Sequence, residues 1–230
     1  MPFRSMLIAG LVSMAGLSAY VYAGDEAAKA ERKPAPVMSH EGVDWLERPE
    51  RDKEEQPDVV LKAMSLRDGN VVVDLGCGSG YFSRRLAKSV APSGKVYAVD
   101  IQAEFLEELK KRCKQEDITN VEPVLGTEDD PKVAPGIADW VLLVDVYHEF
   151  QQPSAMLAKI HALLKPEGRV ALVEYRLEGD SANHIKLEHR MSVEQVTREW
   201  KAAGFVLAQL IESLPSQHLF LFKKAAAPSQ

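Results

Sequence analysis

A short run of small and acidic residues carries the clearest chemical signal in the sequence. Residues 71–87 read VVVDLGCGSGYFSRRLA, with glycines at 76, 78 and 80 between an apolar run and a helical one. Glycines at such a turn let the backbone approach a ligand closely. A dinucleotide fingerprint would place its third glycine at 81, where this chain has Tyr81, and no phosphate-binding Gly-Lys-Ser/Thr run follows. The turn therefore indicates a ligand without a pyrophosphate.

Two acidic residues near this turn indicate which groups the ligand carries. Asp74 directly precedes the turn and suits a cationic group, such as an amino acid ammonium. Asp100 ends the next apolar run, KVYAVD, about twenty residues further on, where a carboxylate accepts both hydroxyls of a ribose. A ribose without a pyrophosphate, beside a site for an ammonium group, describes S-adenosylmethionine.

On these motifs, residues 43–224 resemble the class I S-adenosylmethionine-dependent methyltransferases. The resemblance is carried by VVDLGCGSGYFS, VYAVD, VEPVLGTEDDP, ADWVLLVDVYHEF and LLKPEGRVALVEY, in this order. It implies a Rossmann-like sheet, S-adenosyl-L-methionine as the cofactor and transfer of its methyl group to an acceptor.

The resemblance also assigns residues to the cofactor. The turn and Asp74 would hold the methionine end, while Asp100 and Ile101 would hold the ribose and flank the adenine. The loop 126–129 would face the adenine, and it has Thr127 where many relatives have Asp. Asp145 would lie where the cofactor pocket meets the acceptor pocket. The predicted cofactor-binding residues are Asp74, Gly76, Cys77, Gly78, Gly80, Asp100, Ile101, Thr127, Glu128, Asp129 and Asp145.

The sequence DVYHEF, residues 145–150, is the best candidate for contact with the acceptor. It follows a buried run at the edge where doubly wound sheets place their ligands. Tyr147 and His148 are the predicted catalytic residues, with His148 as a proton acceptor near neutral pH. The alternative is that His148 and Glu149 only cap the following helix. The stretch lacks the Asn/Asp-Pro-Pro-Tyr/Phe motif of amino-group methyltransferases, which disfavours DNA and glutamine as substrates.

Three further residues are predicted to face the acceptor. Glu174 and Tyr175 end the fifth apolar run on the same rim, and His189 lies in HIKLEHRM, interpreted as an exposed helix or a flap over the acceptor. The H-x-x-x-E-H spacing of that stretch is one residue longer than the zinc motif H-x-x-E-H. No metal site is predicted.

Alternating apolar and helical runs supply the frame for these residues. Strands are expected near 71–75, 95–99, 121–125, 139–144 and 169–174, and helices within 43–66 and near 80–90, 102–116, 147–164 and 192–203, with only a short element near 130–134. The last two apolar runs, FVLAQLIES and HLFLFKK, are joined by a loop too short for a crossover helix. The predicted fold is α/β, a doubly wound, mostly parallel seven-stranded sheet with a reversed last strand.

Composition supports one globular domain and sets limits on its partners. The 230 residues are 46% apolar and 27% charged, and the formal net charge of −6 disfavours nucleic acid as a partner. Two cysteines, Cys77 and Cys113, make no disulfide framework.

The first 23 residues form a separate segment. Arg4 is followed by an uncharged stretch from Ser5 to Gly24, and Val21-Tyr22-Ala23 suits a signal peptidase. The prediction is export to the periplasm with cleavage after Ala23; the alternative is a retained inner-membrane anchor, which alone would bring the chain into contact with a membrane. The expected division is then a flexible linker over 24–42, a methyltransferase domain over 43–224 and a disordered tail over 225–230.

The leading functional interpretation is a methyltransferase that acts on a small-molecule acceptor. One alternative keeps the cofactor but takes a protein as acceptor. Another is a non-catalytic module that binds S-adenosylmethionine, suggested because an export signal and a cofactor made in the cytoplasm do not fit easily together. A nicotinamide-dependent oxidoreductase is disfavoured by Tyr81.

Overall fold

The computed structural model describes residues 33–226, and residues 34–226 belong to one compact unit. The predicted export signal or anchor over 1–23, residues 24–32 of the predicted linker and the last four residues of the predicted tail lie outside the described residues. None of the helices within the described part is long and apolar enough to cross a membrane.

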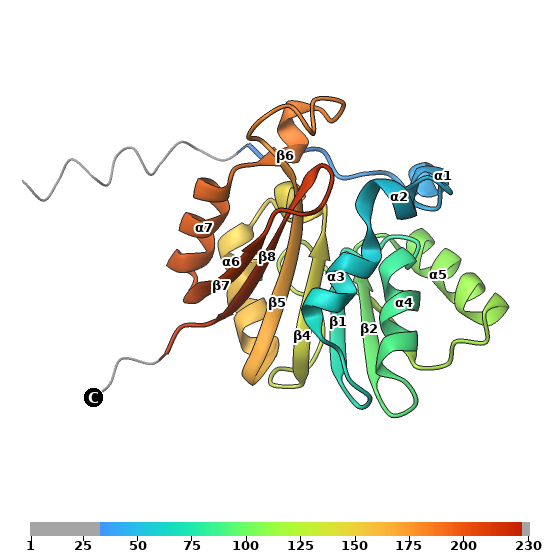
Figure 1. Cartoon of the computed structure of the whole chain (residues 1–230). Coiled ribbons are helices and arrows are strands. Elements are labelled where there is room, and N and C mark those ends of the chain that lie inside the picture. Colours follow the sequence, from blue (N-terminus) through green and yellow to red (C-terminus); the bar gives the residue numbers. More distant parts are fainter. Residues whose placement is uncertain (1–32, 227–230) are drawn as a thin grey trace, which may run out of the picture. The chain divides into compact units, whose positions relative to one another are not determined.

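A central sheet organises this unit (Figure 1). Its strands are β1 Val71–Leu75, β2 Lys95–Asp100, β3 Val121–Leu125, β4 Ala138–Val144, β5 Leu164–Arg176, β7 Phe205–Ile211 and β8 Gln217–Lys224. They follow the order β3-β2-β1-β4-β5-β8-β7, and the two-residue β6 Arg190–Met191 pairs with β5. Neighbours from β3 to β5 are parallel, whereas β8 is antiparallel to both β5 and β7. The predicted seven-stranded sheet with a reversed last strand is confirmed, and β6 is an addition.

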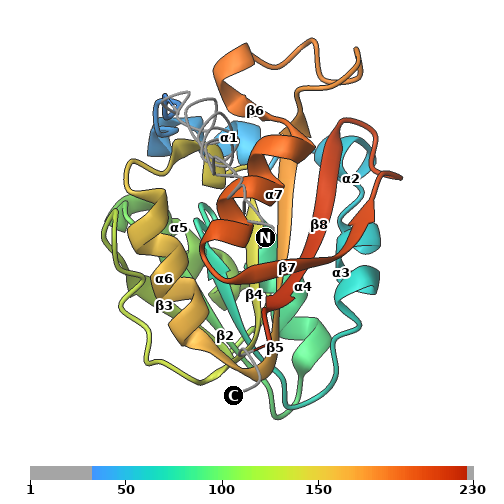
Figure 2. The ribbon, with the colours of Figure 1, turned by 90° about the vertical axis from the view of Figure 1, so that its left-hand side faces the viewer.

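Helices cover both faces of the sheet. They are α1 Val43–Leu46, α2 Arg51–Glu55, α3 Pro57–Met64, α4 Tyr81–Val90, α5 Ala103–Gln115, α6 Pro153–Leu163 and α7 Val193–Ala202. Side chains of α3 and α4 pack in one apolar cluster with β1, β2 and β4, whereas those of α6 and α7 pack in another with β4, β5 and β8. Figures 1 and 2 show these two pairs of helices on opposite sides of the sheet. Because both faces are covered, the central strands are continuous apolar runs.

Proline explains one difference from the expected elements. The helix expected over 147–164 is divided into a 3₁₀ turn, η3 Tyr147–Glu149, and α6, which starts at Pro153. Proline suits the first helical position, but it disfavours helical geometry in the residue before it. The chain therefore leaves β4 through a separate short turn. The connection from β3 to β4 holds no helix, only a bridge between Thr127 and Asp130.

Residues 34–42, which we call the strap, extend the compact unit beyond the predicted domain start. The Ala35 amide donates to the His148 carbonyl at 3.1 Å, and Ala35 is fully buried. Gln102 holds the strap at two points: its Nε2 donates to the Met38 carbonyl at 2.7 Å, and its Oε1 accepts from the His40 amide at 3.0 Å. The strap thus lies against the loops that follow β2 and β4.

Candidate active site

The glycine turn joins the carboxyl end of β1 to α4 and is held tightly. The amides of Gly76 and Cys77 both donate to the Val99 carbonyl of β2, at 2.8 and 2.9 Å. Gly76 has a φ of +78°, and a Cβ there would lie 2.4 Å from the Val146 side chain. Only glycine satisfies both the left-handed conformation and this contact.

A cavity of about 380 Å³ opens over this turn. That size is typical of small-molecule sites. Its wall includes nine of the predicted cofactor residues, namely Asp74, Gly76, Cys77, Gly78, Asp100, Ile101, Thr127, Glu128 and Asp145. The other two lie outside the lining: Gly80 packs against Leu109 of α5, and the Asp129 carboxylate accepts from the Thr127 hydroxyl at 2.8 Å.

Two carboxylates flank the turn and stabilise it. Asp74 is buried, and its Oδ2 accepts from the Ser83 hydroxyl at 2.5 Å. Burial raises the pKa of the Asp74 carboxyl to about 6, against the hydrogen bond from Ser83 and the positive charge of Arg51. Asp100 accepts from the Gly78 amide at 2.8 Å and from the Gln102 amide at 3.0 Å, and burial raises its pKa as well.

Asp145 presents an unsatisfied acceptor to the same cavity. Its φ of +50° is unusual for a residue with a side chain, and its amide donates to the Val173 carbonyl at 2.9 Å. Its Oδ2 accepts from Gln217 at 2.7 Å, but its buried Oδ1 has no hydrogen-bond partner among the described residues. Burial, followed by the negative charges of Glu55 and Glu174, raises the pKa of Asp145 well above its usual range. A cationic donor in the cavity would satisfy this oxygen.

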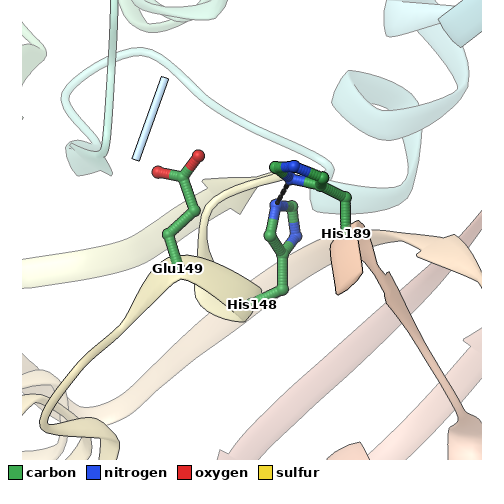
Figure 3. A group of neighbouring side chains, drawn as sticks. All are labelled: His148, Glu149 and His189. Atoms are coloured by element: carbon green, nitrogen blue, oxygen red, sulfur yellow. Dashed lines mark hydrogen bonds between the residues drawn. The ribbon is translucent and has the colours of Figure 1, made fainter. Parts of the chain in front are cut away.

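A chain of three side chains, Glu174, His148 and His189, reaches another part of the wall from behind. Glu174 is fully buried at the end of β5, and its Oε2 lies 2.6 Å from the Nδ1 atom of His148. The Nδ1 atom of His148 is thus paired with Glu174, and Nε2 is the ring nitrogen on the other side, toward His189. That Nε2 atom lies 3.0 Å from the Nδ1 atom of His189 (Figure 3).

Glu149 is the third side chain drawn in Figure 3, next to His148 on η3. Its Oε1 accepts from the Met38 amide of the strap at 3.1 Å. Burial is the main cause that raises the pKa of its carboxyl to about 7, and the nearby His148 opposes this rise. Like His148 and His189, it lines the cavity.

The residues predicted for the acceptor thus take different places. His148, His189 and Tyr175 line the cavity, whereas Tyr147 and Glu174 do not. The fully buried Tyr147 packs on Trp200, with its hydroxyl donating to Glu199 at 2.6 Å. In a 3₁₀ turn consecutive side chains diverge, so Tyr147 points to the core when His148 points to the cavity. Tyr147 is therefore not placed to contact an acceptor, and Glu174 lies behind His148.

Several cavity residues lie outside the predicted cofactor-binding and acceptor residues. They are Val37 and Met38 of the strap, Trp45, Arg51 and Glu55 of the first helices, and His184, Ile185 and Lys186 before η4 Leu187–His189. The last three belong to the stretch interpreted as a helix or flap, which is the one sequence signal that pointed to them.

Comparison with known proteins decides the family. A family model described as a methyltransferase domain matches residues 66–213, which is more than half of the chain. The chain belongs to this methyltransferase family.

Two solved methyltransferase structures share the fold of this chain. A crystal structure of a SAM-dependent methyltransferase from Aquifex aeolicus superposes with a TM-score of 0.75 at 24% identity, covering 81% of this chain and 98% of that one. A TehB-like SAM-dependent methyltransferase from Corynebacterium glutamicum gives 0.61 at 16% identity, with 80% and 97% covered. These likenesses show the fold.

Two curated relatives are more similar in sequence. An uncharacterised 37.1 kDa protein of a Streptomyces fradiae transposon is 34% identical over 153 residues, which are 66% of this chain and 44% of that protein. The demethylmenaquinone methyltransferase of Lactococcus lactis is 32% identical over 114 residues, 50% of this chain and 45% of that enzyme. The chain therefore spans less than half the length of these two relatives.

The methyltransferase family and fold assign S-adenosylmethionine as the cofactor, and the cavity fits it. Gly76 and Gly78 lie on the cavity wall without side chains, so a ligand can approach the main chain of the turn closely. The orphaned oxygen of Asp145 and the buried carboxylate of Asp74 suit the ammonium group of its methionine end. Asp100 and Glu128 also line the cavity, where they would accept hydrogen bonds from the ribose and the adenine.

Proposed function

We propose that this protein transfers the methyl group of S-adenosylmethionine to a small-molecule acceptor that carries a hydroxyl or thiol. The observation that carries the proposal is the pair Glu174–His148, whose ring reaches the same cavity as the glycine turn. The Nε2 atom of His148 contacts His189 at 3.0 Å on the cavity side, and an acceptor that replaces His189 as its hydrogen-bond partner would transfer its proton there.

The cofactor supplies a methyl group on a sulfonium sulfur, which is already an activated leaving group. The protein then has to orient the acceptor and exclude water, which is worth about 7–11 kcal/mol in favourable cases. Apolar side chains on the wall, among them Val37, Met38 and Phe150, support the exclusion of water. The carboxylates Asp74 and Asp145 would hold the cofactor's ammonium group.

An apolar acceptor of modest size is favoured by the same wall. The cavity of about 380 Å³ is bordered by the strap and by residues 184–186, so an extended protein segment has less access than a small molecule. Demethylmenaquinone methyltransferases among the relatives suggest a quinol or another hydroxylated ring as the first acceptor to test.

The first experiment is a calorimetric titration of the full chain with S-adenosylhomocysteine, with NAD as the control ligand. We expect saturable binding of S-adenosylhomocysteine alone. The Asp100→Ala variant should bind it at least about 10-fold more weakly, because a charged acceptor is lost. Absence of binding by folded protein would contradict the methyltransferase proposal.

A second experiment tests catalysis with labelled S-adenosylmethionine and a panel of phenols, quinols and thiols. Transfer that falls in His148→Asn, while that variant still binds S-adenosylhomocysteine, supports the assigned role. Binding without transfer to any acceptor, small molecule or protein, would favour the alternative of a non-catalytic module.

A further inference from the structure

Three potential metal ligands converge on the cavity wall from two separate segments. His148 and Glu149 come from η3, and His189 ends η4. One nitrogen or carboxylate oxygen of each lies within 4.8 Å of the corresponding atoms of the other two (Figure 3). Because the stretch that joins η3 to η4 is about forty residues long, no sequence motif reveals the group.

The distances suit a transition-metal ion. Two Zn–N bonds of about 2.0–2.1 Å at a tetrahedral angle separate the nitrogens by about 3.3 Å. The His148 and His189 nitrogens are 3.0 Å apart and would need to move by only a few tenths of an ångström. A hydrogen bond between the rings explains this distance too, and the Met38 amide holds Glu149 with a carboxylate oxygen within 4.8 Å of both rings, so the three ligands are already gathered.

Glu174 supplies the support that a metal-binding histidine requires. A ligating histidine usually donates its other ring N–H to a carboxylate, which sets the tautomer and the ring orientation. Glu174 accepts from His148 Nδ1 at 2.6 Å and from the Tyr147 amide at 2.7 Å, and it is fully buried. The His148 ring is thereby held with its Nε2 toward His189 and the cavity.

The local charge also favours a cation. Glu149 lines this wall and Glu174 lies behind His148, and within residues 33–226 no ion pair joins either carboxylate to a lysine or arginine. Buried carboxylates are costly unless a positive charge or a metal compensates them. A divalent ion between the two rings and Glu149 would do so.

We propose that His148, Glu149 and His189 bind a divalent transition-metal ion of the Zn²⁺ class, with at least one coordination position open to the cavity. Two histidines and a glutamate match the ligand types of catalytic zinc sites. With the ion bound, His148 Nε2 is a ligand, so the ion takes the place of His148 in activating the acceptor: an acceptor hydroxyl or thiol would occupy the open position and lose its proton to solvent. Its lone pair then forms the bond to the methyl carbon, while the electrons of the broken C–S bond stay on the cofactor's sulfur. Only this acceptor step rests on the proposed function.

The test is a titration of the full chain, first stripped with a chelator, with Zn²⁺ alone and with Co²⁺ alone. We expect a single site per chain and the strong visible absorption of Co²⁺ in a four- or five-coordinate site. Both His189→Ala and Glu149→Gln should weaken binding at least about 10-fold. Glu174→Gln should weaken it by about 10–100-fold, as loss of an outer-shell partner does.

His184→Ala is the matched control. His184 also lines the cavity and lies five positions before His189, but it is outside the cluster, so Zn²⁺ binding should not change. Zn²⁺ affinity that is absent in the parent, or that survives both His189→Ala and Glu149→Gln, overturns the proposal.

Titration with S-adenosylhomocysteine separates this proposal from the proposed function. Each variant that still binds S-adenosylhomocysteine is folded, so loss of Zn²⁺ binding is then specific to the site. Binding of S-adenosylhomocysteine without Zn²⁺ binding by the parent leaves methyl transfer standing and removes the metal. Zn²⁺ binding without S-adenosylhomocysteine binding leaves the metal site standing and contradicts the proposed methyl transfer.

Discussion

The buried carboxyl of Asp74 makes a pH dependence predictable at the level of one residue. Burial raises its pKa to about 6, so the folded protein favours the protonated form over a wider range than the unfolded chain does. The resulting contribution to stability is present below the unfolded pKa, near 4, and is lost as pH rises through about 6. An ammonium group in the cavity favours the ionised form instead.

We therefore predict that S-adenosylhomocysteine binds more tightly as pH rises from about 5 to about 7, in step with ionisation of Asp74. Calorimetry across this range checks it. Asp74→Asn, which still accepts from Ser83, should bind more weakly at pH 7 and show a flatter profile. An unchanged slope in the variant would assign the pH dependence to another group, such as Asp100.

For individual residues, the sequence predicted which residues lie near the cavity better than it predicted where their side chains point. Asp74, Asp100 and His148 follow strands at the edge where ligands bind, so their place on the cavity wall follows from topology. The spacing of residues in the sequence does not show that Tyr147 points from η3 into the core. It also does not show that Glu174 lies behind His148. Both depend on packing against α7 and on hydrogen bonds across the sheet.

At the scale of elements, Gly80 controls how closely α4 approaches α5. Its φ is +83°, and a Cβ there would lie 2.1 Å from the Leu109 side chain. Gly136 provides a matched control, because its φ is +72° but a Cβ would meet nothing within 4 Å. Both alanine variants impose the left-handed conformation on alanine, at a cost of about 1–2 kcal/mol. Gly80→Ala should cost a further 1–3 kcal/mol, roughly, through overpacking.

Urea unfolding of the two alanine variants measures this difference directly. Equal losses of unfolding free energy would show that α4 and α5 adjust without strain, and that the contact with Leu109 does not require glycine.

The strap is an element that composition could not reveal. Its residues are polar or proline-rich and predict a linker, whereas the structure holds them through main-chain hydrogen bonds to Gln102 and Glu149. Strands, by contrast, were predictable because buried parallel strands need continuous apolar runs. Sequence patterns report burial of side chains, and the strap is attached mostly through its backbone.

We predict that Gln102→Ala loosens the strap. Two hydrogen bonds are lost, each worth about 0.5–1.5 kcal/mol. Hydrogen exchange of peptides covering residues 34–42 should accelerate several-fold, and S-adenosylhomocysteine should bind more weakly because Met38 lines the cavity. Gln115→Ala, an exposed glutamine at the other end of α5, is the control and should change neither. Unaltered exchange in Gln102→Ala would mean that other contacts hold the strap.

At the scale of the whole molecule, the N-terminal sequence predicts where the domain works. Cleavage after Ala23 would leave ten residues before Pro34, where the compact unit begins, so the strap and cavity would be complete in an exported protein. We expect the periplasmic fraction to contain a chain that starts at Gly24, as mass measurement of the intact protein would show.

Ala23→Arg should block that cleavage, since signal peptidase requires a small residue there. An uncleaved parent chain in the membrane fraction would support the anchor alternative, and an uncleaved chain in the cytoplasm would contradict both. Export with cleavage also bears on the chemistry, because a periplasmic enzyme would need S-adenosylmethionine outside the compartment that makes it. A periplasmic chain that copurifies with S-adenosylmethionine or S-adenosylhomocysteine would show that the cofactor reaches it.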